Sequence, residues 1–276
     1  MDNKTDIKHV YIYVTMENTA DESLMRVYQD VMDITEDDLL TRLKSGELDS
    51  RSMKEHINAK ILPNSATIVM KYFPGLTISP VDIMGVVDEV ESTYGTGTIA
   101  VLFIDYLDLL TTDSPYDMYR LELAKLVLSL KSMAIQYNIP VATATQLNRT
   151  AYRVENAKDL GADQLGESIK KVEHSDMVMV LHKVTKNGKD KIIGKIAKFR
   201  SNRSGYAIEA NVDFAKYKFH EFTLVKNEDK KDNIKPRYGD STSIDGCVAM
   251  MSNPSLEAPP KRNNTLSLGD EPDTGF

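Results

Sequence analysis

The chain has 276 residues, 41% of them hydrophobic, and a formal net charge of −7. This content suits one α/β core, and the acidic balance excludes a uniformly basic nucleic-acid coat, although a local stripe of Lys and Arg can still bind phosphates. The single cysteine, Cys247, excludes an intramolecular disulfide and a zinc site built from cysteines. No apolar run reaches the ~18 residues of a membrane span, and MDNKTDIKHV contains no signal-peptide core, so we expect a cytoplasmic protein and no membrane partner.

Strand and helix patterns alternate from the start of the chain. Residues 9–15, HVYIYVT, have the β-branched and aromatic character of a buried strand, and residues 17–32 carry apolar side chains at helical spacing. A single helix is predicted over residues 35–60, where Thr35 and Asp38 resemble a capping box. These segments form one βα unit followed by a further helix.

The alternation continues through the middle of the chain. A strand over 66–74 ends at Pro74, and the helix behind it has Pro80 in its first turn. The apolar run AVLFIDYLDLL predicts the next strand, and a long helix follows it. Buried-type strands are then predicted at 139–148 and 176–183, and residues 191–221 predict one or two hairpins.

This order predicts an α/β fold with a mostly parallel sheet, helices on both faces and antiparallel strands at one edge. We expect residues 1–226 to form this domain. Residues 227–276 contain half of the chain's ten prolines, mixed with polar and acidic residues, and predict a mostly disordered tail. Ligands of such sheets bind at the carboxyl ends of the strands.

Five residues fall where a strand-end site is expected. Asp105 ends the run Val-Leu-Phe-Ile and is suited to orienting a water on Mg²⁺, which keeps most of its waters. Glu17 closes the first strand and could polarise an attacking water, and the Gln146 amide could sense a phosphate. Lys198 and Arg200 stand at alternate strand positions, so they share a face and could both reach an anion.

Each of these residues also has a structural interpretation. Asp105 could cap a loop, and Glu17 could be an acidic residue at a helix start. Gln146 could be a structural amide, while Lys198 and Arg200 could belong to a solvated strand face. The functional interpretation depends on their conjunction and their order along the chain. His174 and His182 have no partners at metal-ligand spacing and are interpreted as structural.

The conjunction resembles a known family. The segments in question are VYIYVTMEN, VLFIDYLDLL, VATATQLNRT, DQLGESIKKVEHSDMVMVL and AKFRSNRSG. In order and approximate spacing they resemble the RecA-like motor domain of DnaB-type replicative helicases, over about residues 8–222, and phage versions most of all. The most specific pieces are the I-D-Y-L strand, the Q-L-N-R strand end and the K-x-R pair.

The resemblance implies a role for each strand-end residue. Glu17 matches the catalytic base, and Asp105 matches the Walker B carboxylate that holds Mg²⁺ through water. Gln146 matches the glutamine that couples phosphate to DNA, and Lys198 with Arg200 matches an arginine finger that reaches a neighbouring subunit's ATP. ATP and Mg²⁺ are thus the implied cofactors, and a hexamer moving 5′ to 3′ on single-stranded DNA is the implied assembly.

The segment that lines the central DNA channel in the family departs from its pattern here. Gly166 stands where the family has Arg, and Ile169 stands where it has Gly. Nearby basic residues could replace the lost charge, because binding in such channels depends largely on phosphates; equally, they could be solvated. The candidates for DNA contact are Arg149, Arg153, Gly166, Glu167, Ser168, Lys170 and Lys171.

The phosphate half of the site is missing from these 276 residues. A Walker A loop needs G-x-x-x-x-G-K-[ST], and the Gly-Lys pairs at 188–189 and 194–195 do not fit it. We weigh three explanations: half of a split helicase with a separate P-loop-bearing partner, a truncated reading frame, and a degenerate subunit. The first two are favoured because all five strand-end residues are present. Without the P-loop strand we expect two exposed apolar sheet edges and poor solubility.

The functional prediction is the motor portion of a hexameric replicative helicase, with a primase or helicase loader as a further partner. The alternative is a non-catalytic DNA-binding or assembly subunit on the same scaffold, which the absent P-loop and the altered loop favour. The wording of I-D-Y-L and Q-L-N-R argues against a RecA-type recombinase. If the protein is phage-encoded, its compartment is the bacterial host cytoplasm.

Overall fold

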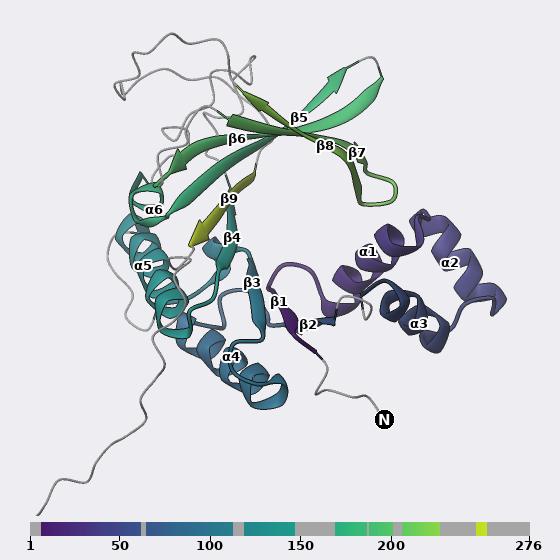
Figure 1. Ribbon diagram of the computed structural model, residues 1–276, viewed down its shortest axis with the longest axis horizontal. Helices are drawn as coiled ribbons and strands as arrows, with labels where there is room; N and C mark the ends of the chain where they lie inside the picture. Colours follow the sequence, from purple (N-terminus) through teal and green to yellow (C-terminus); the bar gives the residue numbers. More distant parts are fainter. Residues whose placement is uncertain are drawn as a thin grey trace, which may run out of the picture.

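Alternating strands and helices build one nine-stranded sheet, in the order β2-β1-β3-β4-β9-β5-β6-β7-β8 (Figure 1). The computed structural model describes residues 7–61, 65–112, 119–146, 169–186, 188–200, 206–226 and 247–252. Within these ranges, no helix is both long enough and apolar enough to cross a membrane.

The first half of the sheet is parallel. Its strands are β1 (His9–Thr15), β2 (Ala66–Tyr72), β3 (Ile99–Asp105) and β4 (Val141–Gln146). β1 pairs with β2 and β3, and β3 pairs with β4, all in parallel. Long connections with helices permit this arrangement, since parallel neighbours cannot be joined by a tight turn. The α/β prediction is therefore confirmed.

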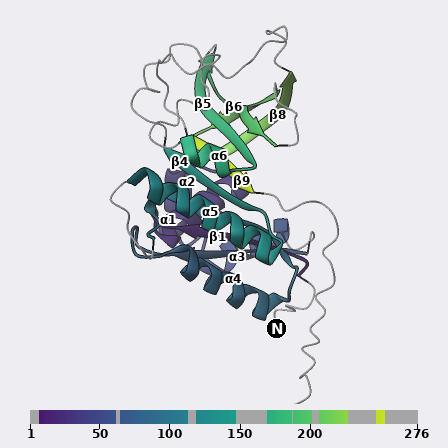
Figure 2. The same cartoon turned by 90° about the vertical axis from the view of Figure 1, so that its left-hand side faces the viewer.

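One face of the parallel strands is covered by α4 (Pro80–Tyr94) and α5 (Tyr119–Tyr137) (Figure 2). Alternate residues of the strands supply the buried face, including Ile12, Leu102 and Ile104, each at most 2% exposed. Fixed φ at Pro80 and the capping box between Ser79 and Asp82 start α4, as the proline position predicts.

Three further helices lie beside β2 (Figure 1). They are α1 (Ala20–Met32), α2 (Glu36–Ser45) and α3 (Ser50–Ile61). The predicted single helix over 35–60 is wrong, although its capping contact at Thr35 is present. Gly46 adopts φ 75° and ends α2, because glycine tolerates this left-handed conformation, and Asp49 then accepts the Ser52 N–H at 2.7 Å as α3 begins.

The second half of the sheet is antiparallel, as predicted for the hairpin segments. The short helix α6 (Ile169–His174) leads into β5 (Met177–Lys186). After β5, the antiparallel half of the sheet continues with β6 (Lys189–Phe199), β7 (Tyr206–Asp213) and β8 (Lys218–Lys226). Each of these strands pairs antiparallel with the next.

The two halves are joined by a strand that the sequence did not predict. β9 (Cys247–Ser252) lies between β4 and β5 and is antiparallel to both (Figure 1). The segment 227–276 is predicted to be a mostly disordered tail, and β9 is a strand within it that this prediction does not include. The prediction of two open apolar edges is wrong at β4 and β5. An apolar strand here satisfies backbone groups that would otherwise be unpaired. The rest of 227–276 lies outside the described residues.

Candidate functional site

Three predicted site residues meet at the carboxyl edge of the parallel strands. Thr15 of β1 is the register partner of Asp105 in β3, and Ile104 is that of Thr143 in β4. Glu17, two residues beyond β1, and Gln146, the last residue of β4, therefore lie at the same edge as Asp105. This is the place where parallel sheets bind ligands.

Asp105 is held by a residue that the sequence reasoning missed. The Tyr13 hydroxyl donates a 2.6 Å hydrogen bond to Oδ2 of Asp105. Burial, followed by the hydrogen bond to Asp105 and the charge of Asp105, raises the pKa of Tyr13 well above its usual range. Tyr13 is therefore a neutral donor at physiological pH. The strand alternation contained the signal, because Tyr13 shares a face with Thr15, the register partner of Asp105.

Gln146 and Glu17 differ in how they are held. Gln146 Nε2 donates to the Tyr106 hydroxyl at 3.2 Å, so its amide is tied to the residue after Asp105. Glu17 is exposed. Its neighbour Asn18 accepts a 2.9 Å hydrogen bond from Arg26 of α1. This contact fixes the loop that presents Glu17 while leaving its carboxylate open to solvent.

A buried ion pair lies behind Gln146. Lys171 of α6 is 3% exposed, and its ammonium contacts the Asp108 carboxylate and donates to Thr145 Oγ1 at 2.6 Å. Thr145 also donates to Asp108. Burial lowers the pKa of Lys171, against the charge and hydrogen bond of Asp108. Lys171 was predicted to contact DNA, and in this arrangement its charge is instead paired with Asp108 in the interior.

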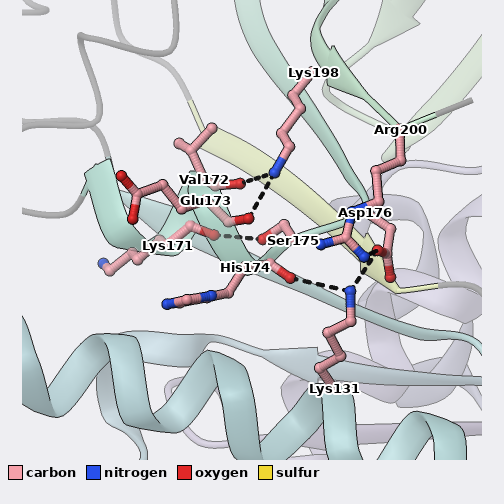
Figure 3. Close-up of polar contacts among 9 residues, drawn as sticks. All are labelled: Lys131, Lys171, Val172, Glu173, His174, Ser175, Asp176, Lys198 and Arg200. Carbon is pink, nitrogen blue, oxygen red and sulfur yellow. Dashed lines mark hydrogen bonds and ion pairs between the residues drawn. The ribbon is translucent and has the colours of Figure 1, made fainter. Parts of the chain in front are cut away.

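Lys198 and Arg200 form a second group, at the junction of α6 and β5 (Figure 3). Lys198 Nζ donates to the carbonyls of Val172 and Glu173, at 2.5 and 2.8 Å. Burial, followed by the charge of Arg200, lowers the pKa of Lys198. An ammonium at these carbonyls caps the carboxyl end of α6.

Arg200 is anchored by a carboxylate that it shares with a second cation. Its guanidinium lies 2.8 Å from Oδ1 of Asp176, and Lys131 of α5 donates to the same oxygen at 2.5 Å (Figure 3). The Arg200 side chain is still 59% exposed. Lys198 lies within β6, whereas Arg200 follows the last residue of that strand, so the two do not occupy alternate strand positions as predicted. Both make contacts within their own chain.

Among the described residues, no three His, Cys, Asp or Glu side chains are grouped as ligands. A single carboxylate fits a magnesium ion that keeps its waters, and Asp105 with its Tyr13 donor is such a group.

Six of the seven candidates for DNA contact have side chains outside the described part of the chain. Lys170 belongs to α6, but its side chain is not among those described. The predictions on Arg149, Arg153, Gly166, Glu167 and Ser168 lie outside the described residues.

Comparisons with known proteins show which family this chain belongs to. Residues 2–223 match the model of the family described as DnaB-like helicase C terminal domain. "Replicative DNA helicase DnaB" of Pasteurella multocida is 29% identical over 103 residues, which cover 36% of this chain and 22% of the relative. Its counterpart in Mycoplasma pneumoniae is 33% identical over 119 residues, covering 42% and 24%. The match thus spans about a quarter of these relatives' length.

Two solved structures share the fold. One, described as "The Structure Of A DnaB-Like Replicative Helicase And Its Interactions With Primase", aligns with a TM-score of 0.61 at 18% identity, covering 77% of this chain and 51% of the other. The second is described as an ATPase domain, and it aligns with a TM-score of 0.57 at 17% identity, covering 78% of this chain and 85% of the other.

Proposed function

Because the chain belongs to the family of the DnaB-like helicase C-terminal domain and has its RecA-like fold, we propose that it is motor machinery of a hexameric replicative helicase. It would couple ATP hydrolysis to 5′–3′ movement on single-stranded DNA. One observation carries the proposal: Asp105, held by Tyr13, stands at the same strand edge as Glu17 and Gln146. A primase or loader is the further partner that this role implies.

Each residue of the strand edge has a defined task in this proposal. The Asp105 carboxylate would hold Mg²⁺ through its waters, and the ion would supply positive charge to neutralise the phosphates. The exposed Glu17 orients the attacking water. Gln146, tied to Tyr106, senses the terminal phosphate, and Lys171 behind it fixes β4 against α6.

Arg200 and Lys198 act across a subunit boundary in this proposal. The exposed Arg200 guanidinium reaches a neighbour's ATP, where a cation stabilises charge that develops on the phosphates. The ion pair with Asp176 orients the Arg200 guanidinium. The phosphate cradle comes from a Walker A segment that residues 1–276 do not contain.

The test is co-expression of this chain with a Walker A-bearing segment of a DnaB-type helicase, followed by ATPase and strand-displacement assays. We expect Asp105→Ala to lower the ATPase rate at least 100-fold, since it removes the group that orients magnesium-bound water. Asp37→Ala, at an exposed position of α2, is the matched control and should retain the rate. An active Asp105→Ala complex contradicts the proposal.

A second function is favoured by two observations. The chain has no Walker A sequence, and both candidate finger residues are engaged within their own chain. A non-catalytic DNA-binding or assembly subunit fits these facts. It predicts DNA binding or ring assembly without any ATPase activity that depends on Asp105, in the same co-expression experiment.

A further inference from the structure

Strands β4 and β5 run in the same direction, with one strand between them. All six residues of β4 pair antiparallel with Cys247–Ser252, and Met177–Val180 of β5 pair antiparallel with the same strand. Among the described strands from β2 to β5, β9 is therefore the one that runs against the others. A strand running with β4 in this position would make the six-strand block parallel throughout.

This position is also where a phosphate-binding strand has to lie. A P-loop joins a strand to a helix, and the phosphates bind at the carboxyl end of that strand. β1 and β3 are paired on both sides, so a further parallel strand fits only beyond β2 or beside β4. At about 4.8 Å per strand, the position beside β4 is about 10 Å from the strand of Asp105, whereas the position beyond β2 is about 14 Å from it and about 19 Å from β4.

A second observation concerns the face of the sheet that carries Asp105. Tyr11 and Phe103 are 38% and 37% exposed there, although the opposite face is covered by α4 and α5. Parallel strands are normally covered by helices on both faces. The helix that follows a P-loop strand would supply this cover, next to the position of β9.

We infer that β9 is a replaceable strand that occupies the place of the phosphate-loop strand. When β9 leaves, the edges of β4 and β5 and the exposed sheet face at Tyr11 and Phe103 form the docking surface. Its occupant is a strand–loop–helix segment that carries the Walker A sequence. The inference rests on the proposed function and names the partner of that site. β9 keeps the backbone groups of β4 and β5 paired until the segment enters.

A reversible disulfide between β9 and β4, called the lock below, tests whether β9 is replaced by the incoming strand. Ala144 of β4 and Ala249 of β9 are register partners, and directly opposite residues of antiparallel strands lie about 4.5–5.5 Å apart, within the range of a disulfide. The lock is Ala144→Cys with Ala249→Cys, made in a Cys247→Ser background. The matched control is Ala144→Cys with Met251→Cys, which is offset by two residues and should cross-link poorly.

The locked and control pairs are placed in the full chain, with the strand–P-loop–helix segment of Pasteurella multocida DnaB fused ahead of Met1 through a Gly/Ser linker. The readouts are amide hydrogen exchange of residues 247–252 and binding of a fluorescent ATP analogue. In the reduced fusion we expect 247–252 to exchange at least 10-fold faster than in the unfused chain, while 141–146 stay protected. Oxidation of the lock should weaken nucleotide binding at least 10-fold, and reductant should restore it.

The inference is overturned if residues 247–252 exchange equally slowly with and without the fused segment, or if the oxidised lock binds nucleotide as well as the reduced form. It is supported if β9 is released and the lock blocks binding. The proposed function is scored separately by hydrolysis and strand displacement. The two can be told apart. If the fusion releases β9 and binds nucleotide only when the lock is reduced, the inference is supported. If that same fusion neither hydrolyses ATP nor unwinds DNA, the proposed helicase function is contradicted.

Discussion

The Tyr13 hydroxyl donates a 2.6 Å hydrogen bond to the Asp105 carboxylate across 92 residues of sequence. Tyr13→Phe removes this donor and keeps the ring. We expect the free energy of unfolding to fall by about 1–2 kcal/mol in urea titrations, because hydrogen bonds to charged groups are stronger than neutral ones. Tyr11→Phe is the control on the same strand face, and its loss should stay below about 0.5 kcal/mol. Equal losses for both variants would contradict a specific role of the Tyr13 hydroxyl.

The buried Lys171 predicts a larger effect. Lys171→Met leaves Asp108 without its cation, and we expect a loss of about 3 kcal/mol in the free energy of unfolding. The double variant Lys171→Met with Asp108→Asn should recover part of that loss, because no unpaired charge remains. Lys44→Met, on the exposed surface of α2, provides the control and should change stability by less than about 0.5 kcal/mol. A double variant less stable than Lys171→Met alone would be the contrary result.

His182 predicts a pH dependence of stability. The ring is 1% exposed, and neither nitrogen has a hydrogen-bond partner among the described residues. Burial, then the charge of Lys195, lowers the pKa of His182 to about 4, against the charge of Glu209. The unfolded chain binds the proton at about pH 6.5, so the folded state loses about 3 kcal/mol as the pH falls from about 7 to about 4.

Urea titrations at several pH values measure this loss. His182→Leu should flatten the stability curve in that window, because the titrating group is gone. His220→Gln, at an exposed position of β8, should leave the slope unchanged. An unaltered slope in His182→Leu assigns the pH dependence to other groups.

The ion pairs of Asp176 should stabilise the fold more than those of a more exposed carboxylate. Its side chain is 18% exposed and binds both Lys131 and Arg200, so Asp176→Asn should cost about 2 kcal/mol. Asp190→Asn breaks a more exposed pair with Lys183 and should cost less than about 1 kcal/mol. Thermal unfolding at low and high salt gives both values. Similar costs for the two variants would show that Asp176 is no more than a surface partner.

Much of the parallel sheet could be predicted from the sequence. Apolar runs such as Val101–Ile104 give strands their burial, and the helices between them impose parallel pairing. The strand-end rule then predicts Glu17, Asp105 and Gln146 at one edge, because that rule depends only on strand order and direction. The order of the strands in the sheet follows from the alternation of strands and helices along the chain, together with the family resemblance.

The features that the sequence did not predict depend on contacts between distant residues, which a local sequence pattern does not contain. Lys171 looks like a solvated lysine in sequence, and its burial follows from the position of Asp108, 63 residues earlier. β9 was missed because five apolar residues and a serine within a Pro-rich polar segment carry little strand signal. The break at Gly46 was missed because the apolar stripe continues across it, although a glycine there is a common helix end.

Helices α1 to α3 enclose a core of their own, formed by Tyr28, Ile34, Leu39, Leu48 and Met53. The β7–β8 turn touches them through Lys216 and Lys218, which pair with Asp33, and through Tyr217, which stacks under Arg26 at 5.2 Å. Surface contacts of this kind contribute little free energy, so we expect the three helices to behave as a separate cooperative unit. We expect their amides to exchange by sub-global opening while β1 and β3 remain closed, and denaturation to depart from a single two-state step.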